Sequence, residues 1–366
     1  MAAMEQSNHD LSSDFIVSDR DGIVENCHLV HAAVVDTTGN LLYFLGNPSR
    51  LTLIRSAAKP MQAVAVIEAG ALEEFGFDEA DLALMCGSHS SEARHVERAK
   101  TMLARLQADE DDLQCGGHPP ISPLVMRTWL RDGFKPSPAS SACSGNHIGV
   151  MAAAKISGAG IADYHSLDHP IQKQIRLIMQ DIAGLGTKGI KWALDSCNMY
   201  SPAMSLQSLA SAYAAFAKAA DNVAHDRVQT FPHAEAMARI YSAMVRHPEN
   251  VAGEGRFCSV LGEAYNGGLF GKGGGDGCYA VAVRSSEDTE RLGAVGGIGI
   301  ALKIEDGNYG IMDAAVAEIL EQLEIGTREV RQRLEVFHQG KVKNSRGVVT
   351  GGLSFPFKLR ENLIAR

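Results

Sequence analysis

The stretch Cys278–Val283, with the sequence CYAVAV, is apolar throughout and is followed closely by a second apolar stretch at 293–304. Two such stretches are typical of paired β-strands. Residues 14–46 alternate apolar and polar stretches around turn-forming residues, which predicts short strands at the other end of the chain. Residues 145–247 are rich in alanine and predict helices. Strands at both ends with helices between them predict an α+β fold, in which helices flank a central antiparallel sheet.

This pattern also predicts the organisation of the chain. Residues 1–13 are polar and acidic, and we expect a flexible N-terminal segment there. Residues 14–366 are expected to form one domain, with a sheet built from 14–55 and 276–305 and a helical region at about 90–250.

Composition narrows the class of protein. The chain has 366 residues, of which 45% are hydrophobic and 21% charged, which is typical of a soluble globular protein. The net charge of -9 and the lack of basic clusters disfavour nucleic acid as a partner. No apolar stretch is long enough for a signal peptide or a membrane span. Seven cysteines without C-x-x-C spacing favour a reducing compartment, so a cytoplasmic location is predicted.

Ser56 and Lys59 form the only Ser-x-x-Lys in the chain and precede an apolar, alanine-rich run that predicts a helix. A spacing of three places both side chains on one helical face, where the amine can take the hydroxyl proton if burial lowers the pKa of the lysine. This layout is typical of serine acyl-transfer enzymes. The alternative is a helix cap followed by a solvated lysine.

Three further stretches combine polar side chains with glycine: Cys86–Glu92, Ser141–His147 and Gly271–Gly274. The first two are also compatible with ordinary helix caps. The third holds Lys272 in a glycine-rich backbone, but its spacing fits neither of the common phosphate-binding motifs. Ser56-x-x-Lys59, Ser144-x-Asn146 and Lys272-x-Gly274 occur in the order of the three motifs of penicillin-recognising serine hydrolases.

A more specific resemblance, from about residue 20 to about residue 325, is carried by seven motifs: Arg55–Pro60, Cys86–Ser90, Cys115–His118, Cys143–His147, Gly253–Phe257, Lys272–Gly274 and Ala301–Asn308. In this order they resemble the class 3, Rhizobium etli type L-asparaginases. The resemblance implies a fold similar to serine β-lactamases and glutaminases, a homodimer, and hydrolysis of L-asparagine to L-aspartate and ammonia.

The resemblance also implies site residues. Two Ser-Lys pairs fall on Ser56 with Lys59 and on Ser88 with Lys272. The family binds zinc through two cysteines and a lysine. These positions fall on Cys143, Cys197 and Asn146, and the last is a departure because an amide oxygen is a weak ligand. The neighbouring His147 is a candidate replacement, and the alternative is that both cysteines are packed or redox-sensitive thiols. The expected substrate-binding residues are Arg55, His89, Asn146 and Asp195, the last for the substrate amino group.

These residues predict a mechanism in which neutral Lys59 deprotonates Ser56, which attacks the side-chain amide of L-asparagine. Lys272 and Ser88 would relay the proton to the departing ammonia, and repulsion between the two ammonium groups would lower the pKa of one lysine. The roles of the two serines are exchangeable at this stage. The alternatives are a glutaminase, an esterase or a penicillin-interacting enzyme, and a catalytically silent protein that binds an amino acid or zinc, which the change at Asn146 would favour.

Overall fold

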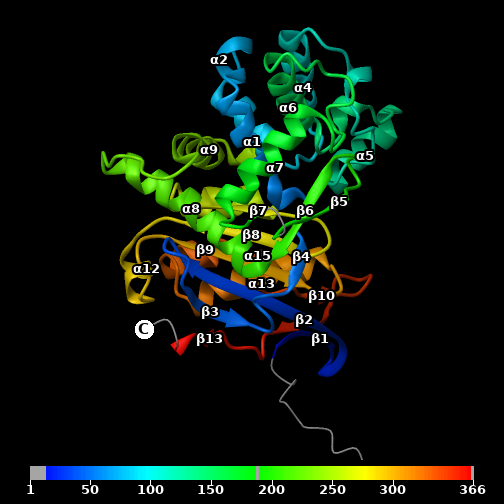
Figure 1. The fold of residues 1–366 in the computed structure, drawn as a ribbon. Helices are drawn as coiled ribbons and strands as arrows, with labels where there is room; N and C mark the ends of the chain where they lie inside the picture. Colours follow the sequence, from blue (N-terminus) through cyan, green and yellow to red (C-terminus); the bar gives the residue numbers. More distant parts are fainter. Residues whose placement is uncertain (1–13, 187–188, 364–366) are drawn as a thin grey trace, which may run out of the picture.

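The central element of the protein is an antiparallel sheet, seen in the lower half of Figure 1 in a computed structural model that describes residues 14–186 and 189–363. The predicted flexible segment 1–13 lies outside the described residues. In the described part of the chain the sheet has eight strands: β1 (Phe15–Arg20), β2 (Ile23–Asp36), β3 (Leu41–Leu45), β7 (Leu269–Gly273), β8 (Cys278–Val283), β9 (Ile298–Ile304), β12 (Leu353–Ser354) and β13 (Arg360–Glu361).

The strand order joins the two ends of the chain. The strands run β12-β1-β2-β9-β8-β7, and β3 pairs with both β2 and β13. In the pairing of β2 with β9, Ala33 lies opposite Ala301, and every pairing in this sheet is antiparallel. The predicted combination of helices with an antiparallel sheet is therefore confirmed. The sheet differs from the expected ranges in that β7 begins at Leu269, β12 and β13 add strands from the C-terminal end, and β4 (Leu51–Leu53) pairs elsewhere.

The centre of the sheet is covered on both faces. Every residue of β8 and β9 is buried, and both strands pack against α8 (Leu206–Ala224) and α13 (Tyr309–Gln322). A methyl group at Gly299 would lie only 1.8 Å from the carbonyl oxygen of Ala210. The glycine is required because the backbone of α8 rests directly on β9.

Most of the helices lie above the sheet in Figure 1, around α1 (Lys59–Glu68), which packs against several of them. Pro60 is tolerated in α1 because the first turn of a helix leaves its N–H groups unpaired. The remaining α-helices are α2 (Ala71–Phe75), α3 (Glu79–Cys86), α4 (Ala93–Leu106), α5 (Pro123–Asp132), α6 (Ser144–Ile156), α7 (Pro170–Ile182), α9 (Ala234–Arg246), α10 (Pro248–Val251), α11 (Phe257–Tyr265), α12 (Glu287–Arg291), α14 (Arg328–Gln332) and α15 (Glu335–His338).

A small sheet and a short helix connect the two halves of the molecule. The small sheet has the order β4-β6-β5, where β5 is Lys191–Leu194 and β6 is Tyr200–Ser205. After β4 the chain enters the 3₁₀-helix η1 (Arg55–Ala58), which contacts β6, β7 and β8 and continues into α1. The Ser-x-x-Lys segment therefore lies where the main sheet meets the helices.

The last elements are the 3₁₀-helices η2 (Glu110–Asp112) and η3 (Pro138–Ser140) and a two-stranded sheet of β10 (Val342–Lys343) and β11 (Val349–Gly351). Within residues 14–186 and 189–363, no helix combines the length and the apolar character that crossing a membrane requires.

Candidate active site

Ser56 and Lys59 lie on one side of the turn from η1 into α1, as their spacing predicts. The N–H of Ile54 still bonds to the carbonyl of Pro202 in the small sheet (3.0 Å), and Arg55 then takes a left-handed conformation with φ of 50°. This turn directs the chain into η1. Ser56 and Lys59 both line a small pocket.

The two predicted Ser-Lys pairs meet at Ser88. Lys59 Nζ lies 3.1 Å from Ser88 Oγ, and Lys272 Nζ lies 3.0 Å from the same oxygen. Lys59 also donates to the carbonyl of Gly87 (2.7 Å) and contacts Cys143 Sγ (3.2 Å). Among the described residues, the hydrogen bonds of Lys59 reach these three groups and none reaches Ser56. The structure thus brings Lys59, Ser88 and Lys272 together, with Ser88 between the lysines.

Lys272 lies on strand β7, which places its side chain beside Ser88. The lysine lies opposite Ala280 of β8, and its side chain is 1% exposed. A methyl group at Gly274 would lie 2.3 Å from the carbonyl oxygen of Ile54. The glycine that lies two positions after the lysine therefore lets the end of β7 pack against the segment that leads to Ser56.

The backbone of Ser88 is fixed by groups outside the pocket. Its N–H donates to the carbonyl of Val251 (2.8 Å), and its own carbonyl accepts from the guanidinium of Arg256 (2.7 Å). Arg256 belongs to one of the motifs of the resemblance but was not among the predicted site residues. Its position identifies it as a residue that holds Ser88 in place.

The two lysines differ in their surroundings. Burial, with smaller contributions from the positive charges of Lys59 and Arg256, lowers the pKa of Lys272 from 10.5 to about 7. Lys59 has three acceptors within 3.2 Å, which matches the three hydrogens of an ammonium group. Lys272 is therefore a lysine that is largely neutral near pH 7.

Cys143 and Cys197 lie in contact beside Lys59. A hydrogen bond from the Cys197 thiol, together with the Lys59 ammonium, holds the pKa of Cys143 well below its usual value. The same hydrogen bond and burial raise the pKa of Cys197. The pKa values of the two cysteines are therefore shifted in opposite directions, and Cys143 is the cysteine that also contacts Lys59.

These residues do not fit a zinc site. In the part of the chain that the structure describes, no three His, Cys, Asp or Glu side chains form a group that could hold a metal ion. His147 does not join the two cysteines as the predicted third ligand. It follows Asn146 on α6, so its side chain is turned by about 100°, and its Nδ1 bonds to the hydroxyl of Tyr164. Two sulfurs and the amide oxygen of Asn146 are a poor donor set for zinc.

Two of the expected substrate-binding residues, Arg55 and Asp195, bind each other. Arg55 Nε donates to Asp195 Oδ1 (2.9 Å), and the same guanidinium reaches Ser196 Oγ (2.8 Å) and Asp276. Asp195 Oδ1 also accepts from the N–H of Ser196 (2.6 Å). Each side-chain hydrogen bond of Asp195 in the described residues uses Oδ1, which leaves Oδ2 free for a ligand of the pocket. Arg55 positions Asp195, since its guanidinium is already occupied.

His89 lies outside the pocket. It is fully buried, its Nδ1 accepts from the N–H of Ser91 (3.1 Å), and its Nε2 donates to Ser144 Oγ (2.9 Å). Burial lowers the pKa of His89 well below 6.5, so the ring is neutral. The structure therefore does not bring His89 together with the other expected substrate-binding residues.

The pocket also contains residues that the sequence analysis missed. Gln62 lies three positions beyond Lys59 on α1, so continuing the same spacing would have found it. Ser201 lies on β6, and no sequence pattern marks it. The pocket is lined by Arg55, Ser56, Lys59, Gln62, Asn146, Asp195, Cys197, Met199, Tyr200 and Ser201.

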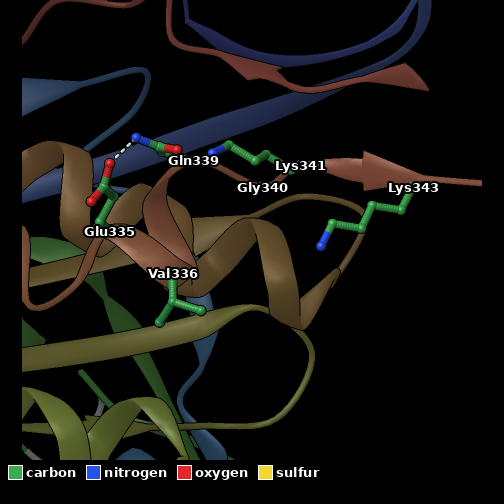
Figure 2. A pocket seen from close by; sticks show the side chains of 6 residues that line it. All are labelled: Glu335, Val336, Gln339, Gly340, Lys341 and Lys343. Atoms are coloured by element: carbon green, nitrogen blue, oxygen red, sulfur yellow. Dashed lines mark hydrogen bonds between the residues drawn. The ribbon is translucent and has the colours of Figure 1, made fainter. Parts of the chain in front are cut away.

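A second, more open hollow lies near α15 and β10. Figure 2 shows Lys341 and Lys343 along one side of it and the hydrogen-bonded Glu335 and Gln339 on the other. No predicted site residue lines this hollow, so the smaller pocket is the candidate active site.

The fold and the pocket together define an α+β protein in which two buried lysines meet at one serine beside a small pocket. A family model described as L-asparaginase II matches residues 16–355, and the chain belongs to this family. The predicted resemblance is thereby confirmed, and the protein is an asparaginase-type amidohydrolase. No curated protein matches the chain. A solved structure named "Crystal Structure Analysis of Mglu" is similar, with 14% identity and a TM-score of 0.40 over 81% of this chain and 68% of that chain.

Proposed function

We propose that the protein is an L-asparaginase that hydrolyses L-asparagine to L-aspartate and ammonia through an acyl-enzyme on Ser56. The observation that carries the proposal is the position of the Ser88 hydroxyl between Lys59 and Lys272, beside the pocket that Ser56 lines, in a chain of the L-asparaginase II family. A carboxamide is a poor electrophile, so its hydrolysis needs an activated hydroxyl and a proton for the departing nitrogen.

Asp195 and Ser56 set the orientation of the substrate. The free Oδ2 of Asp195 binds the α-ammonium group of L-asparagine, while Arg55 keeps the carboxylate in position. The side-chain amide carbon then faces Ser56 Oγ. Ser56 is favoured over Ser88 as the nucleophile because Ser56 lines the pocket, whereas the Ser88 hydroxyl is held by both lysines.

The two lysines and Ser88 form a proton relay. Neutral Lys272 takes the hydroxyl proton of Ser88, which takes a proton from the Lys59 ammonium. Lys59 is then neutral and accepts the proton of Ser56 as the Ser56 oxygen bonds to the amide carbon. The proton returns along the same path to the nitrogen when the C–N bond breaks and ammonia leaves. Water then cleaves the aspartyl ester with the same relay and restores Ser56.

We also propose that the fold is the serine β-lactamase and glutaminase type expected from the resemblance. Support comes from the placement of the Ser-Lys pair at the start of a buried helix and of the second lysine on the edge strand β7. No step of this mechanism passes through a metal, since the donor set beside the pocket suits zinc poorly.

An ammonia-release assay on the purified protein tests the proposal. L-asparagine, L-glutamine and a blank are compared at matched concentrations, with and without chelator. We expect ammonia from L-asparagine well above the blank, little from L-glutamine, and no effect of the chelator. Faster release from L-glutamine would make the protein a glutaminase, turnover of nitrocefin would indicate a penicillin-interacting enzyme, and no release from either amide would leave a silent binding protein.

A further inference from the structure

Three polar side chains of the pocket are buried: Gln62, Asn146 and Ser201 are 4%, 2% and 3% exposed. Two of them have a buried atom, Asn146 Oδ1 or Ser201 Oγ, without a hydrogen-bond partner in the described residues. The three come from α1, α6 and β6, and all three line the pocket with Ser56.

An unpaired polar group inside a protein destabilises the fold, because it has lost its hydrogen bonds to water and gained none. The charged groups of the same pocket do have partners: Lys59 has three acceptors, and Asp195 is bound by Arg55. The free hydrogen-bonding capacity of the pocket therefore includes the neutral atoms Asn146 Oδ1 and Ser201 Oγ and the second carboxylate oxygen of Asp195. Such a set is suited to a polar ligand that supplies the missing partners.

We propose that Gln62, Asn146 and Ser201 recognise the α-amino-acid end of the substrate and so restrict the enzyme to free amino acids. This inference rests on the proposed function. Asn146 Oδ1 and the free Oδ2 of Asp195 are two acceptors in one pocket, which suits an ammonium group. The Gln62 amide and the Ser201 hydroxyl supply donors, which suits a carboxylate. A substrate whose α-amino or α-carboxyl group is blocked leaves these buried groups unpaired.

Ser201→Ala and Gln62→Leu test the carboxylate contact. With L-asparagine, each variant should raise KM about tenfold and leave kcat within about twofold, because the lost hydrogen bond acts on ground-state binding. The melting temperature of Ser201→Ala should stay unchanged or rise, since this variant removes a buried hydroxyl that lacks a partner in the described residues. The matched control is Ser18→Ala on β1, a buried serine whose hydroxyl accepts from Asn26 (3.2 Å). It should lower the melting temperature slightly and leave KM unchanged.

A second substrate distinguishes recognition from a structural role. 3-Aminopropanamide has the carboxamide and the amino group of L-asparagine but no carboxylate. With this compound, Ser201→Ala and Gln62→Leu should turn over at the rate of the unchanged protein, because the group that they contact is missing. Equal losses with both substrates, or an unchanged KM for L-asparagine in both variants, would overturn the inference.

Calorimetric titration with L-aspartate measures binding at the subsite without turnover, so it tests the subsite separately from the proposed function. If the unchanged protein releases no ammonia, the proposed function fails. Weaker L-aspartate binding in the two variants than in the unchanged protein and in Ser18→Ala would still support the subsite. Equal binding in all four proteins, or no binding in any of them, would refute the subsite.

Discussion

Replacing the buried lysine of β7 by methionine should abolish activity and stabilise the protein. Lys272 is 1% exposed, and its pKa falls from 10.5 to about 7 in the folded state. A shift of this size corresponds to roughly 5 kcal/mol of lost stability at and below pH 7. The lysine donates to Ser88 Oγ and to the carbonyl of Gly273, and these two bonds contribute about 1 kcal/mol each. Lys272→Met should therefore gain roughly 3 kcal/mol near pH 6.5.

The stability that Lys272→Met gains should depend on pH. Between pH 7 and 10.5 the unfolded chain binds a proton at Lys272 that the folded chain does not, so the stability of the unchanged protein rises with pH across this window. Lys272→Met lacks this contribution, and its advantage should shrink as the pH approaches 10. Urea unfolding followed by tryptophan fluorescence at pH 6.5, 8 and 9.5 measures both quantities.

The matched control for this measurement is Lys155→Met. Lys155 is an exposed lysine at the end of α6, and its ammonium caps the carbonyl of Leu106 (2.7 Å). Its replacement should leave the pH dependence of stability unchanged. A Lys272→Met protein that is less stable than the unchanged protein at pH 6.5, or an advantage that stays constant up to pH 9.5, would refute the reasoning.

Four further outcomes are expected. First, kcat/KM should rise with pH through about 7, where Lys272 becomes neutral, and Lys272→Arg should be inactive because a guanidinium keeps its proton; a flat profile would contradict the relay. Second, mass spectrometry of acid-quenched protein should find the aspartyl ester on Ser56, and Ser88→Ala should lower kcat about 100-fold; an ester on Ser88 would exchange the two roles. Third, elemental analysis should find less than one zinc per chain, and Asn146→Lys should increase the zinc content; equal contents would show that residue 146 does not limit binding. Fourth, light scattering should give twice the chain mass of 39.1 kDa if the implied homodimer forms, and a mass of one chain would contradict it.

The parts of the fold that were predicted correctly are those set by local sequence. The apolar stretch of β8 and the alanine-rich run of α8 each specify one element, and both were expected. Pairing between distant segments was predicted only in outline. The three residues of β4 belong to the small sheet because β6, about 150 residues later, supplies their partner, and the strand itself does not specify this choice.

The same contrast between local sequence and distant segments holds for the candidate site. Ser56 and Lys59 could be placed together because a spacing of three is a local property of a helix. The meeting of Lys59 and Lys272 at Ser88 depends on three separate segments, so spacing alone could not predict it, and only the resemblance pointed to it. His89 was expected at the substrate, but the burial that its neighbours impose is invisible in the sequence.

The two lysines differ in what surrounds them. Lys59 Nζ contacts Cys143 Sγ, a group whose pKa is held well below its usual value. In the described residues Lys272 donates to a hydroxyl and a carbonyl and to no carboxylate. A buried ammonium without a counter-ion loses its proton more readily than one in an ion pair. In the proposed relay Lys272 is therefore the lysine that accepts a proton through Ser88, because burial lowers its pKa to about 7 and Ser88 Oγ lies within hydrogen-bond distance of both lysines.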